Sequence, residues 1–70
     1  MKEIIFVVEE APEGGYMARA LGQDIFTEGD TIPQLKEMIN KAVNCHFDKD
    51  DLPKMIHLRY IKEETLSVNS

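Results

Sequence analysis

The fold is decided where a strand gives way to a helix, in the stretch Gly29-Asp30-Thr31-Ile32-Pro33-Gln34-Leu35. Thr31 is a residue type favoured at a helix N-cap, and Gln34 three residues later completes a capping-box pattern. Pro33 is tolerated in the first helical turn, because the N–H that it lacks would have no partner there. Apolar residues then recur at three- and four-residue spacing, with a histidine continuing the row: Leu35, Met38, Ile39, Ala42, Val43 and His46. We therefore expect an amphipathic helix with this row buried.

Three strands are predicted before the helix. Residues 3–9 are β-branched or aromatic on both faces, which favours a central strand. A turn at 11–15 contains Pro12 and two glycines, and it leads into a second strand at 16–21. A second turn at 22–24 precedes a short third strand at 25–28. Because tight turns join these strands, we expect an antiparallel meander.

A fourth strand is predicted after the helix. Pro53 prevents the helix from continuing, and residues 55–61 alternate between two faces. A right-handed crossover puts this strand beside the first and parallel to it, in the order 3-2-1-4. The sequence thus predicts an α+β fold, β-β-β-α-β, with one helix packed on a four-stranded sheet. The domain is expected to span residues 1–62, and residues 63–70 are expected to form a tail.

Charge limits the partners that this single domain is expected to bind. The 70 residues include 8 basic and 13 acidic side chains, a net charge of −5. Binding to nucleic acids or anionic membranes depends on clustered Lys and Arg, which are scattered here. A basic protein partner fits the charge better. The N-terminal residues do not have the pattern of a signal peptide, and no apolar run approaches the ~20 residues of a membrane span. The chain has a single cysteine, Cys45. We therefore expect a cytoplasmic protein.

Two stretches of sequence resemble a known family. They are Gly15-Tyr16-Met17-Ala18-Arg19-Ala20 and Phe26-Thr27-Glu28-Gly29-Asp30-Thr31, followed by the amphipathic helix at 35–47. Together with the order of elements, they resemble the HicB antitoxins, which have a partial ribonuclease H-like fold. The resemblance covers roughly residues 1–62 and implies a non-catalytic protein that binds and masks a small basic HicA-type toxin ribonuclease.

The chain also departs from that family. Typical HicB antitoxins add a C-terminal DNA-binding domain, whereas this sequence ends at Ser70, so direct DNA binding is not expected. The alternative is an orphan HicB-like module that forms homo-oligomers and serves another process. A small hydrolase ranks below both.

Patterns for catalysis and metal binding are incomplete. A nuclease of the ribonuclease H type needs a carboxylate in the middle of its first strand, where this chain has Ile5-Phe6-Val7. Cys45 and His46 point about 100° apart on a helix and do not converge on one ion. The acidic run from Asp48 resembles the start of a calcium loop, but Pro53 stands where that loop needs glycine. We expect no catalytic residue, no metal and no cofactor.

Three groups of residues are candidates for protein contacts. Acidic residues at the first turn and after the helix would face a basic partner: Glu9, Glu10 and Glu13, then Asp48, Asp50 and Asp51. Arg19, His57 and Arg59 fall in strand interiors, where they form either a mixed contact surface or an ordinary solvated sheet face. The sheet face without a helix would expose Ile5, Val7 and Ile61, so we expect this face to pair with another copy, giving a dimer or tetramer.

Overall fold

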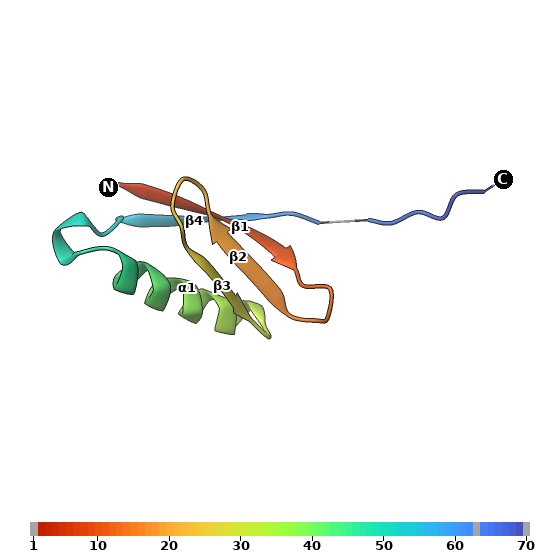
Figure 1. The fold of residues 1–70 in the computed structure, drawn as a ribbon, viewed down its shortest axis with the longest axis horizontal. Coiled ribbons are helices and arrows are strands. Elements are labelled where there is room, and N and C mark those ends of the chain that lie inside the picture. Colours follow the sequence, from red (N-terminus) through yellow and green to blue (C-terminus); the bar gives the residue numbers. More distant parts are fainter. Residues whose placement is uncertain (1, 63, 70) are drawn as a thin grey trace.

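The computed structural model describes residues 2–62 and 64–69. Its elements, in chain order, are β1 (Glu3–Glu10), β2 (Tyr16–Ala20), β3 (Phe26–Gly29), α1 (Ile32–His46), the short 3₁₀ helix η1 (Lys49–Asp51) and β4 (Met55–Tyr60). The strands form one sheet in the order β3-β2-β1-β4, with α1 along one face (Figure 1). The predicted order of elements and of strands is confirmed, and each predicted strand end lies within one residue of the observed one.

Strand β1 is the centre of the sheet. It pairs antiparallel with β2, where Phe6 lies opposite Ala20, and parallel with β4, where Phe6 lies opposite Leu58. β2 in turn pairs antiparallel with β3. Apolar residues on both faces of β1 are therefore consistent with its central position.

The junction between β3 and α1 is closed by two side-chain hydrogen bonds. The Gln34 backbone N–H donates to Thr31 Oγ1 over 3.2 Å, and the Asp30 N–H donates to Gln34 Oε1 over 2.8 Å. Thr31 is extended (φ −130°, ψ 163°), as an N-cap residue should be. The predicted cap is confirmed, although Gln34 accepts from the residue before the cap, one position earlier than in the standard capping box.

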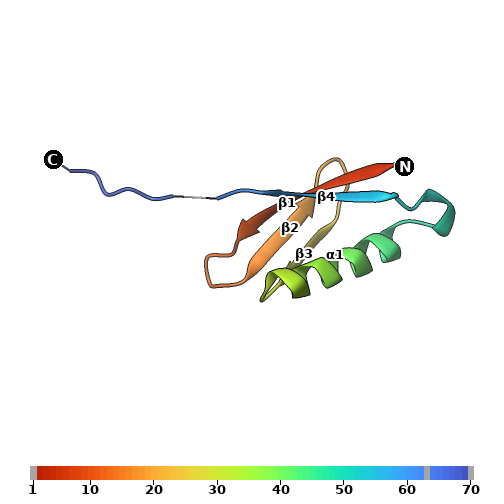
Figure 2. The ribbon, with the colours of Figure 1, turned by 180° about the vertical axis from the view of Figure 1, so that it is seen from behind.

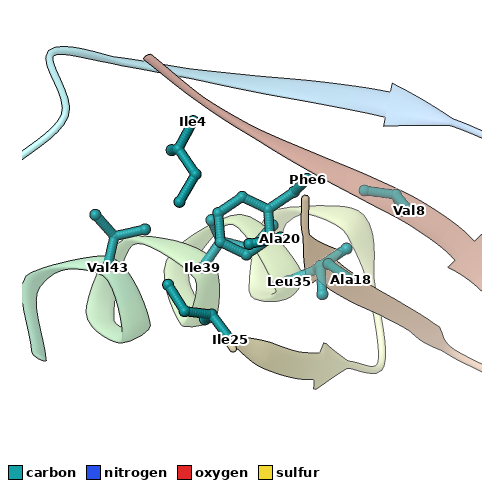
Figure 3. Packing of buried hydrophobic residues seen from close by; sticks show 9 residues of the cluster. All are labelled: Ile4, Phe6, Val8, Ala18, Ala20, Ile25, Leu35, Ile39 and Val43. Atoms are coloured by element: carbon teal, nitrogen blue, oxygen red, sulfur yellow. The ribbon is translucent and has the colours of Figure 1, made fainter. Parts of the chain in front are cut away.

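The core lies between the sheet and α1 (Figure 3). Nine buried apolar side chains form it: Ile4, Phe6, Val8, Ala18, Ala20, Ile25, Leu35, Ile39 and Val43. The small Ala18 and Ala20 occupy β2, which α1 contacts together with β3. The helix buries a single row at four-residue spacing, Leu35, Ile39 and Val43.

The predicted buried stripe was wider than the observed one. Met38 is 38% exposed, and His46 is exposed with its ring edge against Phe47 at 4.9 Å between centroids. These residues belong to the neighbouring row 38, 42 and 46, of which only Ala42 packs against the core. Because α1 covers mainly β2 and β3, Ile56 and Leu58 in β4 are only half-buried.

After β4 the tail, residues 64–69, extends away from the domain (Figure 1). Leu66 is 78% exposed and Val68 is 93% exposed. This extension contributes to the longest of the three principal extents of the molecule, which are 58, 21 and 17 Å.

Candidate functional site

The sheet face opposite α1 is covered by no helix or strand among residues 2–62 and 64–69. We call it the open face. Its side chains come from all four strands and the residue after β4: Glu3, Ile5, Val7, Glu9, Met17, Arg19, Phe26, Glu28, Met55, His57, Arg59 and Ile61. The predicted contact residues Arg19, His57 and Arg59 thus lie on the same face as the predicted oligomer residues.

One row crosses the whole open face. Phe26 pairs with Arg19, Arg19 with Val7, and Val7 with Arg59, so each strand contributes one residue. Phe26 at the sheet edge is 62% exposed. The row therefore places an exposed aromatic ring next to a guanidinium group, with a second guanidinium further along.

The expectation that Val7 is exposed is wrong. Val7 is only 6% exposed, and Ile5 is half-buried, although no helix or strand in the described part of the chain covers them. Val7 stands between two arginines in register, and the aliphatic stems of arginines cover apolar neighbours. The exposed apolar area lies instead around them, on Phe26, Met55 (56%) and Ile61 (48%).

Two hollows lie on the open face. The first, of about 210 Å³, is lined by Val7, Glu9, Met17, Ala18, Arg19 and Phe26. The second, of about 420 Å³, is lined by Glu3, Ile5, His57, Leu58 and Arg59. At the second, His57 Nε2 lies 3.2 Å from Glu3 Oε1, but these side chains are 48% and 64% exposed, so the pair holds the face together only weakly. Each hollow combines an apolar floor with charged rims, an arrangement suited to a side chain of another protein.

The structure does not bring the two predicted acidic clusters together. Glu9, Glu10 and Glu13 lie at the turn between β1 and β2, at the end of β1. Because β4 is parallel to β1, the segment 48–51 before β4 lies at the start of β1, at the opposite end of the sheet (Figure 2). Of these acids only Glu9 belongs to the open face. Glu9 and Glu10 also line a cleft of about 450 Å³ between the turn and Thr65 of the tail.

Other groups that carry chemistry stay apart. Within residues 2–62 and 64–69, no three His, Cys, Asp or Glu side chains are grouped closely enough to hold a metal ion. Cys45 is a free, exposed thiol on α1 beside the exposed His46. No helix in the described part of the chain is both long and apolar enough to span a membrane.

Sequence reasoning missed several residues of the open face. Phe26 and Met55 are its most exposed apolar members, yet neither was predicted to be a contact residue. A signal was present at Phe26, because it alternates with Ile25 and Thr27, which are both buried. A large aromatic residue out of phase with the buried residues of its strand points to the opposite face.

Comparisons with known proteins give two relatives and one family. No family model and no solved structure matches the chain. A UPF0150 protein of Thermotoga maritima is 46% identical over 67 residues, which cover 96% of this chain and 94% of the relative. A UPF0150 protein of Archaeoglobus fulgidus is 50% identical over 52 residues, covering 74% of this chain and 77% of the relative. With such identity over nearly the full length of both sequences, the chain belongs to the UPF0150 family of small proteins.

Proposed function

We propose that this chain is a non-catalytic protein-binding module, similar to the HicB antitoxins, that binds a small basic protein through its open face. The observation that carries the proposal is the row Phe26, Arg19, Val7 and Arg59, with an exposed aromatic ring at its edge. Phenylalanine, methionine and arginine are enriched at the centres of protein interfaces. Phe26 and the nearby Met17 line one hollow, which gives a partner side chain a place to insert.

The negative charge of this chain supports a positively charged partner. Glu3, Glu9 and Glu28 lie on the open face around the apolar and arginine row. The whole chain carries −5 at pH 7. The two acidic clusters at opposite ends of the sheet add to the long-range field that attracts a cationic protein, rather than forming one contact. A basic toxin ribonuclease of the HicA type has the complementary charge.

The non-catalytic part of the proposal rests on β1. The middle of this strand, Ile5-Phe6-Val7, is apolar, with Phe6 fully buried and Val7 nearly so. Two-metal hydrolysis needs carboxylates that hold two metal ions about 4 Å apart. A hydrolase of this kind would need such carboxylates outside the middle of β1.

The test begins with identification of the partner. The tagged protein is purified from its native cell, the bound protein is identified by mass spectrometry, and both are then purified for binding kinetics. Phe26→Ser removes the exposed ring, whereas Met38→Ser removes an exposed apolar side chain on α1 and is the matched control. We expect Phe26→Ser to weaken binding by about tenfold or more, as for the loss of an aromatic anchor, and Met38→Ser to leave it unchanged.

Salt provides the second readout. The Debye length falls from about 10 Å at 0.1 M salt to about 3 Å at 1 M, so a steered on-rate should fall with it. An acidic partner, or binding that is insensitive to both Phe26→Ser and salt, would contradict the proposal. The alternative, an orphan homo-oligomeric module, draws support from a different surface, the outer edge of β4, which pairs with no other strand in the described part of the chain.

A further inference from the structure

The outer edge of β4 is unpaired among residues 2–62 and 64–69, since this strand has β1 as its only neighbour. The Met55 N–H donates to the Lys2 carbonyl over 3.1 Å, and the Ile61 N–H donates to the Val8 carbonyl over 2.9 Å. In a parallel ladder alternate residues bond to the same neighbour, so the backbone groups of Ile56, Leu58 and Tyr60 point away from the sheet. Such an edge is a template for another strand.

The same edge borders an apolar groove. Ile56 and Leu58 direct their side chains to the α1 side of the sheet, opposite Ile4 and Phe6 of β1. A groove of about 330 Å³ runs between β4 and α1, lined by Lys36, Ile39, Asn40, Ile56 and Leu58. Because both β4 residues remain half-exposed, the core is incomplete on this side.

The tail has the sequence pattern of a strand. In Thr65-Leu66-Ser67-Val68-Asn69, apolar and polar residues alternate strictly, and threonine and valine are β-branched. Leu66 and Val68 are the two most exposed large apolar residues described in the chain. Two apolar side chains at this spacing match the spacing of Ile56 and Leu58 in the groove.

The tail is poorly placed to fold back on its own β4, which leaves the groove open to the tail of a second copy. The tail leaves in the direction of β4 and away from α1 (Figures 1 and 2). A return would need a tight hairpin, and such turns rely on Gly, Asn, Asp or Pro. The sequence Ile61-Lys62-Glu63-Glu64-Thr65 contains none of these residues.

We propose that the tail of one copy adds as an antiparallel strand to β4 of a second copy, and that the exchange is reciprocal. Residues that exchange both hydrogen bonds in an antiparallel ladder point their side chains to the same face. The tail residues that bond to Ile56 and Leu58 therefore direct their side chains toward α1. Leu66 and Val68, the two apolar residues that alternate in the tail, fit these positions. The result is a two-fold dimer with one continuous sheet, in which Leu66 and Val68 fill the groove. The open face remains free, so this inference does not depend on the proposed function.

The test is the mass of the full chain in solution, measured by sedimentation equilibrium from low micromolar to millimolar concentration. The double variant Leu66→Glu with Val68→Glu places charges on the apolar set, and Thr65→Glu with Ser67→Glu places the same charges on the polar set. These positions are exposed in the single chain, and circular dichroism checks that each variant folds. We expect the wild-type chain to form a dimer of twice 8.0 kDa. The first variant should weaken dimerisation by about tenfold or more and so convert the protein to monomer. The second variant should remain a dimer.

Two results would overturn the proposal. One is a wild-type monomer throughout the concentration range. The other is a dimer that survives Leu66→Glu with Val68→Glu. If such a dimer were instead dissociated by Phe26→Ser, the contact between copies would lie on the open face.

Discussion

Gly29 ends β3 directly beside the first turn of α1, and an alanine there should destabilise the domain by steric conflict. A Cβ at this position would lie 2.8 Å from the Leu35 backbone N and 3.0 Å from Leu35 Cα. Both neighbours are backbone atoms, so no side-chain rotation relieves the contact. Gly29 is also paired with Tyr16 across the ladder, which prevents the strand from simply moving away.

The expected cost follows from these contacts. Adding a methyl group to a well-packed site costs about 1 to 3 kcal/mol, and we expect Gly29→Ala near 3 because backbone must shift. Gly22 is the matched control: its φ of 79° disfavours alanine, but no atom lies within 4 Å of the new Cβ. Left-handed backbone costs an L-residue about 1 to 2 kcal/mol. At about 0.05 to 0.15 kcal/mol per residue, a 70-residue domain has a stability of about 4 to 10 kcal/mol, so the Gly29 variant would lose a large part of it.

Urea unfolding followed by far-ultraviolet circular dichroism measures both variants. Protein concentration is held fixed, because self-association would add to the apparent stability. A Gly29→Ala protein as stable as the wild type, or less affected than Gly22→Ala, would mean that β3 and α1 are not in the close contact described here.

Further predictions use the same urea assay. Thr31→Ala removes the hydroxyl that accepts from Gln34 and should cost about 1 kcal/mol, whereas the exposed Lys36→Ala should change stability by less than about 0.5 kcal/mol; equal effects would mean that Thr31 is not the cap. Leu35→Ala empties a fully buried site and should cost about 3 to 5 kcal/mol, several times the effect of Met38→Ala, and similar losses would contradict the narrow buried row. Glu3→Gln breaks an exposed contact with His57 and should cost less than about 1 kcal/mol; a larger loss would show that this contact is structural.

The strand order was predictable because local and long-range signals agreed. The apolar residues on both faces of β1 favoured a central strand, and a right-handed crossover favoured a position beside β1 for β4. The Thr31 cap set the helix start within one residue. Each of these signals depends on a few residues and on the right-handedness of crossover connections, so a single sequence was sufficient to predict the strand order.

The details of the open face depend on side-chain size and on the register between strands. The alternation of apolar and polar residues along a strand does not specify either of them. Val7 was expected to be exposed because no predicted element covers it, but it is 6% exposed and stands in register between two arginines, a residue type whose aliphatic stem covers apolar neighbours. The width of the buried helix row depends on how far α1 extends over β4, which the periodicity of the helix cannot specify. The two acidic clusters, in contrast, could have been placed at opposite ends of the sheet from the sequence, because this separation follows from the predicted parallel pairing of the first and last strands.

The central position of β1 affects how the chain is made. Its segment Ile4-Ile5-Phe6-Val7-Val8 is β-prone and uncharged, the composition of an aggregation-prone segment. This strand leaves the ribosome before its parallel neighbour, which begins only at Met55, after β2, β3 and α1. Until β4 docks, one edge of β1 can pair with a foreign strand, and pairing between distant segments is slow to form. Glu3, Glu9 and Glu10, which flank the segment, place charges at both its ends and disfavour such pairing during this interval.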